Sequence, residues 1–151
     1  MSKLTSFEIY DLVNRSRPLW LRGIDLSEVD LCGVDLSHAN LAGANLSGAK
    51  LNGANLNRSI LYAANLSGAD LSSADLRCAE LSHSILTNAT MLHTKLEMSN
   101  LSYANLTGAT FTRANLTGVK RILEDLGYGD KSDFGGAILM FTTMPDGSYY
   151  K

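Results

Sequence analysis

Histidine and cysteine are the residues of this chain with the widest chemical range, because they ligate metals, transfer protons and act as nucleophiles. The 151 residues include three histidines, His38, His83 and His93, and two cysteines, Cys32 and Cys78. The two cysteines are 46 residues apart, a spacing that matches neither a disulfide framework nor a zinc motif, so we expect free thiols in a reducing compartment. No P-loop, GxGxxG, HExxH or GxSxG motif occurs. The sequence therefore predicts no catalytic, metal or cofactor site.

The overall composition is typical of a folded domain. Hydrophobic residues make up 45% of the chain, charged residues 19%, and the formal net charge is −2. This balance argues against disorder, and no run of 18 apolar residues predicts a membrane span. Residues 1–4 lead into no apolar export segment. We expect one cytoplasmic domain without membrane contact.

The positions of the 25 leucines reveal an internal repeat of five residues. From Leu26 to Leu116 every fifth residue is leucine, except Met91 and Phe111, which gives 19 central positions. Leu21 extends the register by one step. The residue two before each centre is small except at Ile24, Val29 and Val34, and is alanine twelve times. Aspartate or asparagine stands between the two positions twelve times. The consensus is A(D/N)LxG.

A period of five fits neither a long helix nor a long strand. Leucines five apart would scatter around a helix and would alternate between the faces of a strand. A short extended segment followed by a turn of serine, asparagine and glycine fits the pattern. If every turn bends the same way, the chain forms a solenoid with the leucines inside.

Runs such as Ala39–Gly43, Ala44–Gly48 and Ala69–Ser73 resemble the pentapeptide-repeat family of bacterial, cyanobacterial-like proteins. The resemblance covers residues 24–118 and implies an all-β fold, a single-stranded right-handed quadrilateral parallel β-helix with four pentapeptides per coil. On that arrangement 19 repeats make about 4.75 coils with a height of about 23 Å. His38 and His83 would lie at different corners and His93 on another face, so they form no metal site.

Both flanks of the repeats predict caps within the same domain. We expect a helical cap over residues 1–20, the β-helix over 21–118 and a C-terminal helix and strand cap over 119–151. The N-terminal signals are a capping box of Thr5 with Glu8 and a hydrophobic staple of Leu4 with Ile9. The C-terminal signals are a short helix over 119–126, a strand over 137–143 and a turn over 145–147 into Ser148, Tyr149 and Tyr150. Trp20 and Leu21 should begin the first coil, and we favour Trp20 as a core residue over a binding anchor.

Stacking residue i on residue i+20 sorts the outward side chains. It predicts three sets of alternating charge: Asp30, Lys50 and Asp70; Asp75 with Lys95; and Arg77 with Glu97. Residues 24–118 hold eight acidic and five basic side chains, a net charge of −3.

Apolar residues at outward positions mark a candidate protein-interaction face, whose members are Ile60, Tyr62, His83, Ile85 and Tyr103. Ile60 and Ile85 stand where the repeat has aspartate or asparagine, and exposed groups of this kind anchor protein interfaces. An equally weighted alternative is that a terminal extension covers both isoleucines. Leu92 and Met98 are candidates for a second contact.

The leading hypothesis is a non-enzymatic scaffold that presents a rigid flat face to a protein partner. The alternative is a DNA mimic that binds DNA gyrase, as some proteins of the resembled family do, although its acidic surface should be dense. An enzyme is the most distant alternative, because flat faces offer no pocket. We expect no direct binding of nucleic acid, and a monomer, with a dimer through residues 138–141 as the other possibility.

Overall fold

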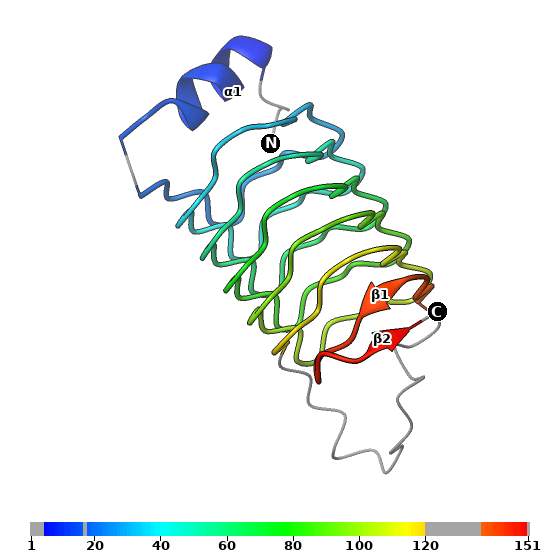
Figure 1. The fold of residues 1–151 in the computed structure, drawn as a ribbon. Coiled ribbons are helices and arrows are strands. Elements are labelled where there is room, and N and C mark those ends of the chain that lie inside the picture. The colour runs from blue at the N-terminus through cyan, green and yellow to red at the C-terminus, as the bar shows by residue number, and fades with distance from the viewer. Residues whose placement is uncertain (1–4, 17, 120–136, 151) are drawn as a thin grey trace.

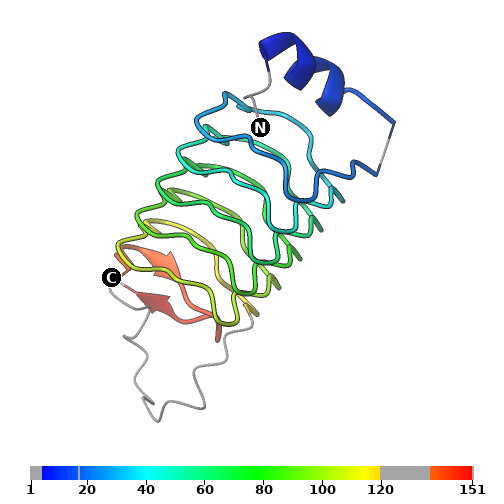
Figure 2. The same ribbon diagram turned by 180° about the vertical axis from the view of Figure 1, so that it is seen from behind.

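The computed structural model describes residues 5–16, 18–119 and 137–150. Most of these residues form a solenoid of stacked coils (Figure 1). Helix α1 (Ser6–Val13) lies at the N-terminal end, and strands β1 (Thr142–Thr143) and β2 (Tyr149–Tyr150) lie at the C-terminal end. The view from behind shows the same order of coils along one axis (Figure 2).

Parallel pairing between residues twenty apart holds the coils together. Asn65, for example, is bridged to Asn45 in the coil before and to Ile85 in the coil after. The Leu66 N–H donates to the Ile85 carbonyl at 2.7 Å, and the Asn65 N–H donates to the Ala44 carbonyl at 2.9 Å. Four pentapeptides therefore complete one turn of the solenoid, which is a right-handed β-helix.

Each pentapeptide ends in a tight turn that makes one corner. The Ala69 N–H donates to the Leu66 carbonyl at 3.1 Å, and Gly68 has a φ of 66°. A positive φ at the third residue of such a turn favours glycine. The outward Asn65 supports the turn, because its Oδ1 accepts the Ser67 N–H at 3.1 Å. This bond explains why aspartate and asparagine dominate the position before each leucine.

The interior is a column of the repeated leucines and small residues. All 19 central side chains are buried, including Met91 and Phe111 in place of leucine. Two hydroxyls at the inward small position bond to the backbone, since the Ser59 Oγ donates to the Leu56 carbonyl and the Thr94 Oγ1 to the Leu71 carbonyl, each at 2.8 Å. The buried Oγ atoms of Ser84 and Ser99 have no hydrogen-bond partner among the described residues. The inward orientation of alanine and leucine predicted from the repeat is confirmed.

Four sides surround this interior, and we number them from the first outward residue. The first side presents Trp20, Asn40, Ile60, Glu80 and Asn100; the second presents Asp25, Asn45, Asn65, Ile85 and Asn105; the third presents Asp30, Lys50, Asp70, Thr90 and Thr110; the fourth presents Asp35, Asn55, Asp75, Lys95 and Asn115.

The N-terminal segment places α1 next to the first coil. The predicted capping box is confirmed: the Glu8 N–H donates to the Thr5 Oγ1 at 3.3 Å and the Thr5 N–H donates to the Glu8 Oε2 at 2.8 Å. The Thr5 N–H and the Thr5 hydroxyl both donate to the Glu8 carboxylate and lower the pKa of Glu8, the backbone bond most. Ile9 and neighbouring apolar residues of the helix pack against the core. Leu4, the other half of the predicted staple, lies outside the described residues.

The C-terminal segment continues the solenoid after residues 120–136. Ile138 is bridged to Thr110 and Thr143 to Asn115, so the third and fourth sides gain another layer with an offset of 28 residues instead of 20. Leu139 and Met144, five apart, point inward and are buried. β1 then pairs antiparallel with β2, and the Gly147 N–H donates to the Met144 carbonyl at 2.9 Å in the predicted turn. The predicted helix over 119–126 lies, apart from Val119, outside the described residues.

Candidate functional site

Three of the five predicted interface residues form a stack of rings at one corner of the solenoid. The ring centroids of His83 and Tyr103, which are twenty residues apart, lie 4.9 Å apart at an interplanar angle of 18°. The Tyr62 ring meets His83 edge-on, with centroids 5.5 Å apart and an angle of 65°. Both geometries are favourable for aromatic pairs. The two tyrosines nevertheless remain about half exposed, at 48% and 58%.

Ile60 and Ile85 flank this corner on the first and second sides. Each is 42% exposed. The described parts of the terminal segments lie at the two ends of the solenoid and leave both isoleucines open to solvent (Figure 1). Neither isoleucine can accept the turn N–H that an asparagine accepts, so each replaces a local stabilising bond with exposed apolar surface. We call Ile60, Tyr62, His83, Ile85 and Tyr103 the aromatic edge.

Trp20 is an exposed residue that the sequence interpretation placed wrongly. It begins the first coil as predicted, through its bridge to Asn40, but its side chain is 76% exposed and does not fill the core. Leu19 and Leu21 on either side point inward instead. Trp20 thus lies on the first side, two coils before Ile60. The signal was present in the register, since Leu21 is a central residue and the residue before each centre points outward.

Charge is sparse around the aromatic edge. The register places the five lysines and arginines of residues 24–118 on the third and fourth sides or at the two corners that border the fourth side. The charged residues around the aromatic edge are Arg22, Asp25 and Glu80, which lie on the first and second sides and at the corner between them. The Glu80 carboxylate accepts the Ser82 N–H and the Asn100 Nδ2, each at about 3 Å. This surface is apolar and weakly acidic.

The acidic residues of the first coil form the base of polar columns. The Asn45 Nδ2 donates to the Asp25 Oδ1 at 3.1 Å, and the Asn55 Nδ2 donates to the Asp35 Oδ1 at 3.0 Å. In such a column each amide nitrogen donates a hydrogen bond to the residue in the coil before it. The first residue of the column therefore needs only to accept a hydrogen bond. Aspartate meets that need without an unused donor. The acidic residues Asp25 and Asp35 are therefore explained by the solenoid itself.

The predicted charge pairs are only partly present. Lys50 lies 3.9 Å from the Asp30 carboxylate, with both side chains exposed. Arg77 pairs with Asp75 at 2.6 Å, within one turn, and not with Glu97 as predicted. The two Arg77 bonds to one carboxylate lower the pKa of Asp75 and raise that of Arg77. The local pair prevails because two residues of one turn hold a bidentate geometry that a pair across coils does not reach.

The histidines and cysteines lie apart. All three histidines occupy turn positions with positive φ, at three different corners, so His93 lies at a corner and not on a face. Within the described residues no group of three His, Cys, Asp or Glu side chains could hold a metal ion. Cys32 and Cys78 are free thiols. A hydrogen bond with Asp30 raises the pKa of Cys32. In the described part of the chain, no helix has the length and apolar character to cross a membrane.

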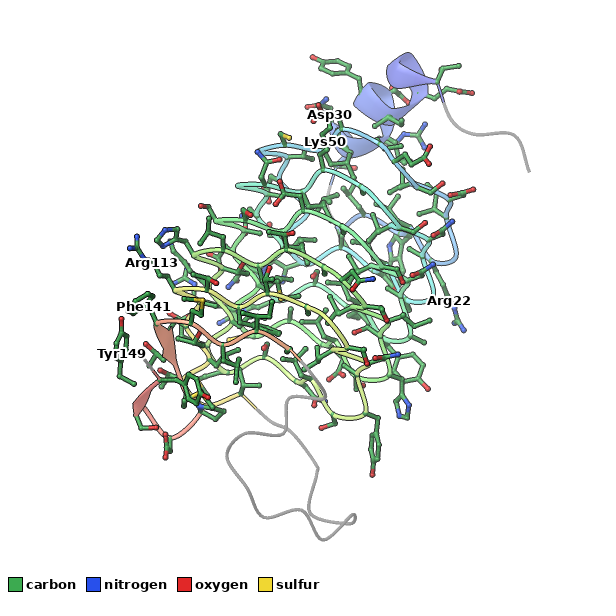
Figure 3. All side chains as sticks on the ribbon, turned by 90° about the vertical axis from the view of Figure 1, so that its right-hand side faces the viewer. Arg22, Asp30, Lys50, Arg113, Phe141 and Tyr149 are labelled. Carbon is green, nitrogen blue, oxygen red and sulfur yellow. The ribbon has the colours of Figure 1, made fainter. Side chains whose placement is uncertain are left out.

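Other exposed apolar residues gather away from the aromatic edge. Leu92 and Met98, predicted as a second contact, occupy different corners of their coil. Beyond Leu92 the Arg113 guanidinium lies 6.0 Å from the centroid of the Phe141 ring. Figure 3 shows Arg113 and Phe141 on the opposite side of the solenoid from Arg22, which marks the corner of the aromatic edge.

Comparison with known proteins identifies relatives of the same architecture. The family model described as pentapeptide repeats matches eight copies over residues 24–61, 64–102 and 94–120. No curated protein matches the chain. A solved pentapeptide repeat protein, Rfr23 from the cyanobacterium Cyanothece 51142, is 35% identical with a TM-score of 0.58, over 70% of this chain and 63% of that one. This chain thus spans less than two thirds of Rfr23.

Two further solved structures are similar in sequence. HetL from the cyanobacterium Nostoc sp. strain PCC 7120 is a pentapeptide repeat protein involved in heterocyst differentiation regulation. It is 34% identical over 87% of this chain and 72% of its own, with a TM-score of 0.32. A pentapeptide repeat protein from the Arabidopsis thaliana thylakoid lumen is 34% identical over 70% of both chains, with a TM-score of 0.42. The family model covers more than half of the sequence and leads to one conclusion: the chain belongs to the pentapeptide-repeat family.

Proposed function

We propose that this protein is a non-enzymatic interaction scaffold that presents the aromatic edge to a protein partner. The observation that carries the proposal is the half-exposed stack of Tyr62, His83 and Tyr103 between two exposed isoleucines. Tyrosine and tryptophan are enriched among residues that dominate binding energy. A backbone bonded to neighbouring coils holds these anchors in place, so little conformational entropy is lost on binding.

The solenoid ends and the thiols complete the proposal. We propose that α1 and the segment 137–150 act as caps, because α1 packs on the first coil and the C-terminal segment bonds to the fifth. A cytoplasmic location is supported by two exposed free thiols, Cys32 and Cys78. A monomer is the proposed state, and the exposed side chains of Ile138, Met140 and Phe141 are the surface through which a dimer would form.

The alternative function, mimicry of DNA toward gyrase, needs a dense acidic surface. The first coil carries its aspartates as the base of polar columns, and residues 24–118 have a net charge of only −3. We therefore expect no inhibition of gyrase supercoiling by stoichiometric protein at physiological salt. Strong inhibition in that assay would put the mimic ahead of the scaffold.

A double substitution tests the scaffold. Ile60→Asn with Ile85→Asn restores the repeat pattern, so each asparagine can accept the N–H two residues on and donate to the coil before. We expect the fold and thermal stability to be kept while affinity capture of the partner from the native host is lost. Met98→Asn is the matched control, since Met98 is 69% exposed at another corner and its left-handed conformation suits asparagine.

Two results would count against the scaffold. Equal capture by the double variant and the unmodified protein would mean that the aromatic edge does not bind the partner. A large loss of thermal stability in the double variant would mean that the isoleucines are covered in solution and pack against another part of the chain.

A further inference from the structure

We propose that the occupant of the aromatic edge is a proline-rich segment in the polyproline II conformation, lying parallel to the solenoid axis. This inference rests on the proposed function and names the chemistry of its partner. It follows from the spacing of the anchors, from the amide donors beside them and from the charge of the surface.

Two pairs of anchors are spaced by two coils, and the exposed His83 ring lies between the members of one of these pairs. Tyr62 and Tyr103 lie on the same corner two coils apart, and Trp20 and Ile60 lie on the first side two coils apart. Two coils span about 9.6 Å along the axis. A polyproline II helix repeats every three residues, at about 9.3 Å. A segment of this conformation along the corner therefore places every third side chain against successive anchors.

Interruption of the asparagine columns leaves amide donors next to the anchors. An asparagine elsewhere in these columns donates its Nδ2 to the coil before, as Asn65 does to the Asn45 Oδ1. Asn40 stacks on Trp20 and Asn105 stacks on Ile85, neither of which offers an acceptor. Among the described residues, neither the Asn40 Nδ2 nor the Asn105 Nδ2 donates a hydrogen bond that would compete with one to a bound peptide. Polyproline II has no internal hydrogen bonds, so its carbonyl groups are free to accept from these amides.

An added strand fits this surface less well. Strand addition needs an unpaired edge, but Ile60 is already bridged to Asn40 and Glu80 on its two sides. Proline-rich segments are recognised by aromatic side chains, which Tyr62, His83 and Tyr103 supply at this corner. The two carboxylates of Glu80 and Asp25 outnumber the one cation, Arg22, on this surface, which favours a segment that also carries a basic residue.

Trp20 supplies a direct readout, because it is the only tryptophan and is 76% exposed on the first side. Decaproline with one terminal arginine is titrated into the full chain, and binding is followed by Trp20 fluorescence and by calorimetry. A glycine–serine decapeptide with the same terminal arginine is the control peptide. We expect saturable heat and a blue shift with decaproline and neither with the control.

Two variants locate the binding. Tyr103→Gly removes one anchor at a left-handed position where glycine is well tolerated, and we expect an affinity for decaproline lower by about tenfold. Met98→Asn should leave that affinity unchanged. Circular dichroism on each variant establishes that the fold is kept.

The proposal is overturned if decaproline gives neither heat nor a fluorescence shift at millimolar concentration, if the control peptide binds equally, or if Met98→Asn weakens binding as much as Tyr103→Gly. A partner captured through the aromatic edge that lacks a proline-rich segment would also overturn it, while leaving the scaffold function in place. A third outcome is that decaproline binds while the double variant Ile60→Asn, Ile85→Asn still captures the partner. That result would count against the scaffold function alone.

Discussion

The corner of the aromatic edge carries Gly23 and Gly43 in its first two coils and His83 and Tyr103 in two later coils. All four have positive φ, at 67°, 66°, 60° and 60°. Glycine adopts this conformation without steric cost, whereas a side chain with a Cβ pays of order 1–3 kcal/mol. The two rings are therefore placed where the backbone alone would favour glycine. Non-glycine residues take the same conformation at other turns, Ala63 and Ser73 among them, so this strain belongs to the repeat and is not specific to the aromatic edge.

We expect Tyr103→Gly to change the free energy of unfolding by less than about 1 kcal/mol. Relief of the left-handed strain offsets the lost stacking on His83, of about 0.5–1.5 kcal/mol, and the backbone entropy of glycine, of about 0.5–1 kcal/mol. Tyr62→Gly is the comparison, because Tyr62 is at the turn position whose φ is not positive. With no strain to relieve, Tyr62→Gly should cost about 1–2 kcal/mol.

Urea unfolding of the two variants measures the difference. Equal destabilisation by both substitutions would show that the left-handed conformation of Tyr103 carries no cost. A near-neutral Tyr103→Gly would also establish that its loss of peptide binding is not a loss of folding.

The structural element of this protein is the pentapeptide, in which neighbouring positions differ sharply in environment. Leu66 is fully buried between the leucines of adjacent coils, while Ser67 lies in the turn with its Oγ 2.7 Å from the Asn65 Oδ1. A charge at position 66 would enter an interior that offers no partner. A charge at position 67 would face solvent.

We expect Leu66→Asp to lower the free energy of unfolding by several kcal/mol, because an unpaired carboxylate replaces a packed leucine. Ser67→Asp should change it by less than about 0.5 kcal/mol, as surface substitutions usually do. Thermal unfolding of both variants, followed by circular dichroism, checks the pair. Similar melting temperatures for the two would be incompatible with the inward leucine column.

Much of the fold was predictable at this scale, because the bonds that define it are local or recur at a fixed period. The five-residue period placed the central leucines, and stacking at twenty residues placed His83 against Tyr103. The capping box of α1 was predictable because Thr5 and Glu8 are three residues apart. Longer-range features were harder to predict. The repeat register resumes in residues 137–141 and 142–146, but these residues pair with the coil before at an offset of 28 residues. The fixed period of the repeat does not contain this offset.

The prediction for Trp20 failed for a different physical reason. Large aromatic residues are usually buried, but the register places residue 20 outward and overrides that tendency. The Arg77 pairing failed because a bond within one turn competes with a bond between coils. The role of the aromatic edge stays a prediction, since its binding depends on a partner whose chemistry the repeat does not encode.

At the scale of the whole molecule, each coil bonds only to the coils before and after it. Solenoids of this kind gain stability from nearest-neighbour contacts, so a defect is felt locally along the axis. The last layer is the segment 137–144, which accepts the Phe111 N–H at the Ile138 carbonyl and the Arg113 N–H at the Met140 carbonyl, both at 2.8 Å. This layer is bonded to the solenoid on one side by these contacts and carries β2 on the other.

Hydrogen exchange should therefore separate an end defect from a central one. Leu139→Asp places a carboxylate in the buried position of the last layer, and we expect faster exchange at the Phe111 and Arg113 amides with unchanged exchange in the first three coils. Leu66→Asp should raise exchange in the central coils on both sides of the defect. Met140→Asp, at a residue 51% exposed, is the control and should leave the pattern unchanged. Uniformly faster exchange along the whole solenoid in Leu139→Asp would mean that the coils unfold as one cooperative unit and that the C-terminal layer holds the entire molecule together.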